Sequence, residues 1–189
     1  MGRDLGPRGR KWVVSLHVLS SGLWLGAAAA MVAVMWLRPV APRTAAELLA
    51  WCLAVKLIDD VVVIGSAAGS LLTGLMLSWR TKWGLFVWYW VGFKLVATVL
   101  MVAFGATCLG PWIDRAAAAA GRSGLDALSD PTFRADDVRA RVFGALQAGL
   151  LAFVVFVSVF KPWGRVARSL RQAGNAVPGA GSSGQGNEG

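Results

Sequence analysis

The sequence predicts an all-α membrane protein: an antiparallel bundle of four transmembrane helices with both termini in the cytoplasm. Four long apolar stretches, at residues 12–37, 58–78, 85–109 and 142–160, are each bounded by Trp, Arg or Lys. About 20 apolar residues suffice for a helix to cross the ~30 Å hydrocarbon core of a bilayer. Of the 189 residues, 56% are hydrophobic and only 15% are charged, whereas soluble domains carry about a quarter charged residues. We therefore expect residues 1–171 to form one membrane domain.

The distribution of charge predicts the orientation. Four spans place the N-terminus, the turn at 79–84 and the C-terminal tail on one side of the membrane. Basic residues dominate that side: Arg3, Arg8, Arg10, Lys11, Arg80, Lys82, Lys161, Arg165, Arg168 and Arg171 against Asp4 and Glu188. On the other side, positive and negative residues balance. Because Lys and Arg near helix ends are retained in the cytoplasm, we expect a multi-pass protein of a bacterial inner membrane with cytoplasmic termini.

The net charge of +9 does not require a nucleic-acid partner. The basic residues lie in short loops beside the bilayer, where each gains about 1 kcal/mol from anionic headgroups. The lipid bilayer is therefore the expected partner, together with a homo-oligomer or other membrane proteins.

Local signals predict how the first two spans are joined and packed. Thr44 followed by Glu47 is typical of a capping box, so a helix should begin there and run into the span at 58–78. Lys56 and Asp60 are spaced to form an ion pair at the external interface, and the alternative is an external entry site for a proton or cation. Small residues recur every four positions in both spans, which predicts a close helix–helix contact. These residues are Gly22, Gly26 and Ala30 in the first span, and Gly65, Gly69 and Thr73 in the second.

The remaining chain contains two further signals. Residues Ala116–Ala120 predict a short helix in the external loop, and Asp130-Pro131 predicts the start of the helix that leads into the last span. Residues 172–189 are rich in Gly and Ser without apolar periodicity, so we expect a disordered tail.

Four polar residues, His17, Thr73, Tyr89 and Lys94, are expected to converge in the cytoplasmic leaflet. His17 lies roughly 9 Å along the first span, and Thr73 lies at a comparable depth. Lys94 is deeper and costs about 2.5–3.5 kcal/mol to insert, which makes it a candidate functional residue. Two interpretations are open. The cluster binds a porphyrin, quinone, metal or anionic substrate, or else Lys94 extends to the headgroups while His17 forms a packing hydrogen bond.

Metal and redox chemistry is constrained by the ligands present. With a single His, one chain cannot supply a bis-histidine haem or a typical zinc site, although a five-coordinate haem on His17 is open. The external side also holds sulfur ligands that suit Cu(I). This set contains Met31, Met35, Met101, Cys108 and Cys52. Met at helical spacing is more often core packing, and the two Cys residues are alternatively a disulfide pair.

Five motifs follow one another along the chain: His17-Val-Leu-Ser-Ser-Gly-Leu-Trp24-Leu-Gly26, Ser70-Leu-Leu-Thr73-Gly74, Thr81-Lys82-Trp83-Gly84, Tyr89-Trp90-Val91 with Lys94, and Lys161-Pro162-Trp163-Gly164-Arg165. In this order they resemble a family of small bacterial four-helix membrane proteins that is classed only as a domain of unknown function. The first span also has a more distant similarity to copper-resistance type membrane proteins. Members of the four-helix family often have a His before the Tyr-Trp pair, where this chain has Trp88.

No catalytic constellation is recognisable in the sequence, so an enzyme is not indicated. We expect a structural or partner-binding membrane component. The alternative is a haem-, quinone- or copper-handling membrane protein that uses His17 and Lys94 or the external sulfur residues.

Overall fold

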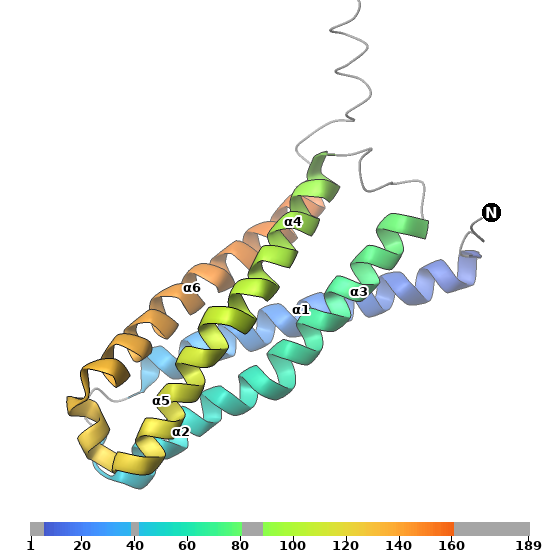
Figure 1. Cartoon of the computed structure of the whole chain (residues 1–189). Coiled ribbons are helices and arrows are strands. Elements are labelled where there is room, and N and C mark those ends of the chain that lie inside the picture. Colours follow the sequence, from blue (N-terminus) through green and yellow to red (C-terminus); the bar gives the residue numbers. More distant parts are fainter. Residues whose placement is uncertain (1–5, 39–41, 81–88, 161–189) are drawn as a thin grey trace, which may run out of the picture.

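The computed structural model describes residues 6–38, 42–80 and 89–160, and this part of the chain is almost entirely helical. Four long helical rods lie roughly antiparallel and form one elongated bundle (Figure 1). The described chain starts at one end of the bundle and finishes at that same end with the last helix. The predicted all-α class is therefore confirmed. The predicted tail at 172–189 lies outside the described residues.

The first rod is α1, Pro7–Leu37, which begins five residues before the predicted span. The second rod combines α2 (Ala45–Leu57), the π-helical segment η1 (Ile58–Val63) and α3 (Ile64–Arg80) without a break. Its start confirms the predicted cap, because the Thr44 hydroxyl oxygen accepts the Glu47 amide at 3.1 Å. The Glu47 carboxylate in turn accepts the amide of Arg43 at 2.7 Å.

The third rod combines α4 (Tyr89–Phe104), the π-helical segment η2 (Gly105–Leu109) and α5 (Gly110–Ser123). The alanine run that predicted a separate short helix lies inside α5, so this helix continues the third rod instead of standing apart from it. Gly124, with φ of +57°, ends α5 and starts the short 3-10 segment η3 (Gly124–Ser129).

The fourth rod is α6, Pro131–Phe160. As predicted, it begins at Pro131, and the Asp130 carboxylate accepts the amide of Thr132 at 2.8 Å. Pro at the first position of a helix has no amide to leave unpaired, and its ring fixes the helical φ angle. The predicted span at 142–160 is thus the second half of a longer helix.

Three groups of buried side chains hold the rods together along the bundle. At the end formed by α2, α5 and η3, Leu48 and Phe133 pack against the alanines of α5. A second group joins Met35, Val55, Ile113 and Ala140. The third surrounds Trp24, which is only 2% exposed, and joins α1 to α3, α4 and α6. The core therefore changes from small alanine contacts at one end to large apolar contacts in the middle.

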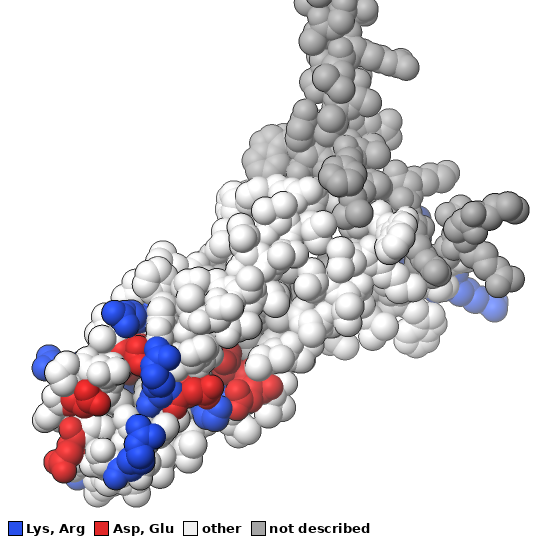
Figure 2. Space-filling model, in the orientation of Figure 1, with Lys and Arg blue, Asp and Glu red and all other residues white. Residues whose placement is uncertain are grey.

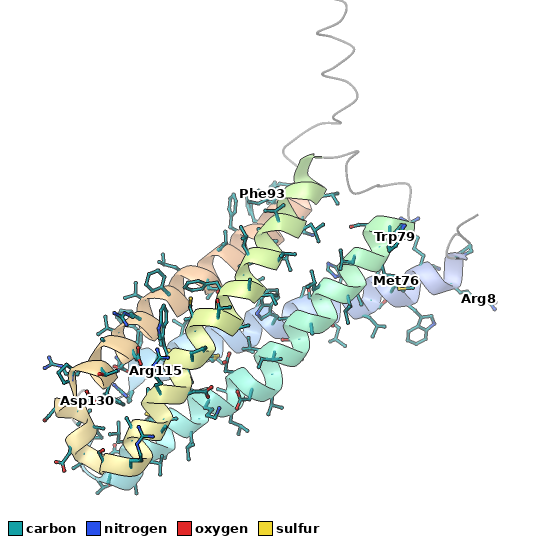
Figure 3. All side chains as sticks on the ribbon, in the orientation of Figure 1. Arg8, Met76, Trp79, Phe93, Arg115 and Asp130 are labelled. Atoms are coloured by element: carbon teal, nitrogen blue, oxygen red, sulfur yellow. The ribbon has the colours of Figure 1, made fainter. Side chains whose placement is uncertain are left out.

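Charged side chains are concentrated at the end of the bundle that holds α2, α5 and the start of α6 (Figure 2). Figure 3 places Arg115 and Asp130 at this end, and Arg8, Trp79 and Phe93 toward the opposite end. Between the ends, large apolar side chains are exposed on several helices, among them Leu19, Leu100 and Leu146. Apolar surface exposed around a bundle is typical of a protein surrounded by lipid.

Within the described residues, three helical runs are long and apolar enough to cross a membrane: Pro7–Leu37, Val91–Ser129 and Pro131–Phe160. They coincide with three of the four predicted spans. The predicted span at 58–78 falls on η1 and α3, and α3 by itself has 17 residues. The first four residues of the predicted span at 85–109 lie outside the described part.

One packing prediction is wrong in its detail. The contact between α1 and α3 is extensive, as expected, but the small residues of α1 do not form it. Gly22 and Gly26 are exposed and a methyl group added to either would meet nothing within 4 Å; the same is true of Gly65. Two members of the α3 row are at the contact: a Cβ added at Gly69 would lie 2.9 Å from the Ser20 hydroxyl oxygen, and the Thr73 hydroxyl oxygen lies 3.0 Å from His17. Serines, His17 and Trp24 instead form the packed face of α1.

Candidate functional site

His17 links α1 to α3 through one ring nitrogen. Its Nδ1 lies 3.1 Å from the backbone oxygen of Ser70 and 3.0 Å from the hydroxyl oxygen of Thr73. The ring also lies against Gly74, where an added Cβ would come within 3.2 Å of the His17 Cε1 atom. Glycine at this position therefore makes room for the imidazole. The structure thus brings together two of the four residues that the sequence predicted to converge.

The hydrogen-bond network assigns the tautomer of His17. The Thr73 hydroxyl donates its single proton to the backbone oxygen of Gly69 at 2.6 Å. Its oxygen can then only accept from the imidazole, and the Ser70 carbonyl is an acceptor in any case. Nδ1 therefore carries the proton in the neutral ring, and Nε2 has a free lone pair. Histidines that ligate metals commonly donate their other N–H to a carbonyl in this way.

Buried hydroxyl groups extend this polar contact between α1 and α3. Ser21 and Ser70 share a hydrogen bond of 2.7 Å, and Ser70 is only 6% exposed. One turn further along α3, Ser66 is 5% exposed and donates to the backbone oxygen of Val62 at 2.5 Å. These groups are paired, so they cost little to bury, and the bond between Ser21 and Ser70 fixes the rotation of α3 against α1. Sequence reasoning missed this row, although Ser66, Ser70 and Thr73 are spaced along one helix face.

Lys94 and Tyr89 are the other two residues that the sequence predicted at this site. Lys94 is half-buried on α4 and close enough to His17 for their charges to interact. Tyr89 is the first residue of α4, and its side chain lies outside the described part of the structure. Two helices therefore supply the direct contacts of the His17 site, and a third supplies a nearby amine.

Four of the five sulfur residues proposed for copper pack in the three core groups. Met35 packs beside Val55 with Met31 against the same group, Met101 packs beside Trp24, and Cys52 belongs to the group around Leu48. Cys108 belongs to none of these groups. Cys52 and Cys108 are both free thiols, so the open question of a disulfide is answered in favour of unpaired cysteines. Burial raises the pKa of the Cys52 thiol, which keeps it protonated and weakens it as a metal ligand at neutral pH.

Ion pairs hold the charged end of the bundle together. Asp136 is 1% exposed and accepts two hydrogen bonds from Arg115, at 2.7 and 3.1 Å. The Asp137 carboxylate joins Arg38 at 2.8 Å and Arg141 at 3.0 Å, which ties the end of α1 to α6. The pair of Asp137 with Arg141 lies within α6 at i,i+4 spacing. The pairs of Asp136 with Arg115 and of Asp137 with Arg38 join different elements, so sequence spacing does not indicate them.

The predicted pair between Lys56 and Asp60 is confirmed at 2.9 Å. Lys56 also forms an ion pair with Asp114 of α5, which sequence analysis did not anticipate. Hydrogen bonds to these two carboxylates raise the pKa of Lys56, so the amine stays protonated at neutral pH. Lys56 therefore bridges the second and third rods where the charged end meets the apolar part of the bundle.

The comparisons with known proteins add no relative. No protein-family model, no curated protein and no solved structure matches this chain. The function must therefore be argued from the residues and their geometry.

Proposed function

We propose that the chain is a four-span protein of a bacterial inner membrane, with both termini in the cytoplasm. The fourth span is η1 together with α3, which complete the rod between α2 and the basic turn. Three apolar helical runs and the exposed apolar side chains around the bundle support a location in lipid. The excess of Lys and Arg at the end with the termini supports the orientation.

Reporter fusions test the topology. A cytoplasm-active fluorescent reporter fused after residue 189 should be active, and a periplasm-active phosphatase inserted after Asp126 should be active as well. The fluorescent reporter inserted after Asp126 and the phosphatase fused after residue 189 should both be inactive. Activity of the phosphatase at residue 189 would place the C-terminus outside and refute the proposed orientation. Recovery of the protein in a detergent-free supernatant would refute the membrane location.

Within the membrane, we propose a structural or partner-binding role in which two copies of this chain associate through α1. The observation that carries this proposal is the exposed row of Gly22, Gly26 and Ala30, which no other described helix covers. In lipid, rows of small residues at four-residue spacing let two helix backbones approach closely, and such contacts drive helix association. A second copy presents the same row and is therefore a suitable partner.

Self-association can be measured by energy transfer between labelled chains in liposomes. Gly26→Leu should abolish the transfer, because its side chain projects from the proposed contact. Gly149→Leu is the matched control, since Gly149 is an exposed glycine of α6 with no atom within 4 Å of an added Cβ. Equal transfer in both variants would contradict an α1 interface, and a monomeric wild-type chain would exclude self-association.

A second candidate function is cofactor binding at His17. The lone pair on Nε2, fixed by the Nδ1 hydrogen bonds to Ser70 and Thr73, supports a haem held by one protein ligand. The visible spectrum of the purified protein tests it. A Soret band that disappears in His17→Phe but persists in Ser15→Ala would favour haem binding. No band after reconstitution with haemin would refute it and leave His17 as a packing residue.

A further inference from the structure

A partly open pocket lies between the rods where the charged end meets the apolar part, and its empty space, counted together with its open mouth, is about 490 Å³. Every long rod contributes to its wall, and so do both π-helical segments. Trp24, Met31 and Met35 come from α1, Asp59 from η1 and Gln147 from α6. Gly105 and Gly144 also line it. π-helical turns occur often at functional sites, and here two of them flank one space.

Asp59 is the ionisable group in the cavity wall. The described residues offer its carboxylate no hydrogen bond or ion pair, whereas Lys56 beside it is engaged by Asp60 and Asp114. Asp59 is half-buried and approaches the third rod closely: a Cβ added at Gly110 would lie 3.7 Å from its Oδ2. Glycine there leaves space next to the carboxylate. The carboxylates of Asp59, Asp60 and Asp114 surround the single amine of Lys56, so the region around Asp59 has a net negative charge that favours a cation.

The rest of the wall limits which cation fits. The described residues hold no group of three His, Cys, Asp or Glu side chains that would chelate a metal ion. Instead, most of the lining is apolar and includes Trp24 and two methionines, together with one carboxylate and one amide. Methyl groups on a cation pack against apolar side chains of this kind, and the flexible thioether of methionine adapts to their shape. An organic ammonium ion therefore matches both the charge and the apolar surface.

We infer that this cavity binds a small alkylammonium cation, with the Asp59 carboxylate as its counter-ion and its methyl groups against the apolar wall that includes Met31 and Met35. The Gln147 amide adds a polar contact from α6. Its Nε2 lies 3.7 Å from a Cβ that would be added at Gly105, so it reaches the wall formed by η2. This inference concerns a different part of the bundle from His17 and is independent of self-association through α1.

Equilibrium dialysis of the full chain in detergent, with radiolabelled tetramethylammonium, tests the inference. This probe is charged at every pH and is compact, and tert-butanol serves as an uncharged compound of similar size. The wild-type protein should bind about one tetramethylammonium per chain and no tert-butanol. Asp59→Asn should weaken binding at least tenfold. The matched control Asp60→Asn should weaken it less than threefold, because Asp60 is absent from the cavity lining and faces Lys56.

A second pair of variants separates loss of the site from loss of the fold. Gly144→Leu places a side chain in the cavity while keeping the Asp59 charge, so it should abolish binding. Gly149→Leu adds the same side chain to an exposed position of the same helix and should bind like wild type. Failure of the wild-type chain to bind, equal weakening by Asp59→Asn and Asp60→Asn, or unchanged binding in Gly144→Leu would each overturn the inference.

Discussion

Leu48 offers a direct test of how the charged end of the bundle is packed. This α2 side chain is 0% exposed and lies among Ala116, Ala117 and Ala120 of α5 and Phe133 of α6. Leu48→Ala removes three carbon atoms, which at about 0.8 kcal/mol for each buried CH₂ costs roughly 2.4 kcal/mol. The alanine neighbours have no rotatable side chains that could fill the space. A residual cavity of about 50 Å³, at ~24 cal/mol per Å³, adds roughly 1.2 kcal/mol.

The expected loss of unfolding free energy is therefore about 3.5 kcal/mol. Titration with SDS from a mild detergent, followed by circular dichroism, measures this difference. Leu53→Ala on the same helix is the control: Leu53 is 48% exposed, and its truncation should cost less than about 1 kcal/mol. Equal losses in the two variants would refute the view that Leu48 anchors a rigid core between α2 and α5.

Three further changes probe other contacts by simple measurements. Gly69→Ala should destabilise the α1–α3 contact because its methyl group would meet the Ser20 hydroxyl at 2.9 Å. Gly149→Ala, at an exposed position of α6 with nothing within 4 Å, should instead gain about 0.5–1 kcal/mol from helix propensity. A change of the same sign for both variants in SDS titration would contradict the packing. The Cys52 thiol, 8% exposed and with its pKa raised by burial, should react with iodoacetamide at least tenfold more slowly in the folded protein than in SDS, and equal rates would disprove its burial. Thr44→Ala should lower the unfolding free energy by about 1 kcal/mol through loss of the helix cap, and an unchanged midpoint would show that the cap adds no stability.

Much of the fold could be predicted because its signals are local. The start of α2 at Thr44 and of α6 at Pro131 depend on residues adjacent in sequence, and the apolar lengths follow from the thickness of a bilayer. The faces of the helices could not be predicted in the same way. In a helix that is apolar all round, the pattern does not distinguish the packed side from the lipid side. For this reason the row at Gly22 and Gly26 was assigned to the wrong contact.

The same difference between local signals and helix packing separates the candidate sites that could be predicted from those that could not. His17 and Thr73 were predicted to meet, because both are polar residues at the same depth in neighbouring spans. The π-helical segments and the Asp59 cavity were not predicted, since an extra residue in a helical turn leaves no recognisable sequence signature here. The pairing of Asp136 with Arg115 depends on how α5 folds back onto α6, which sequence spacing does not encode.

The π-helical segments have a consequence for the rotational setting of the bundle. Each residue of an α-helix turns the chain by about 100°. The wider turn of η1 takes up one extra residue, so α3 is rotated relative to the position it would have in a continuous α-helix of the same residues. If all six residues of Ile58–Val63 wound as an ordinary α-helix, α3 would turn by about 100° and Ser70 would leave its partner on α1. Deleting one residue together with that change would keep the same face of α3 against α1. The π-helical winding of this short stretch thus sets which side of the downstream helix faces its neighbour.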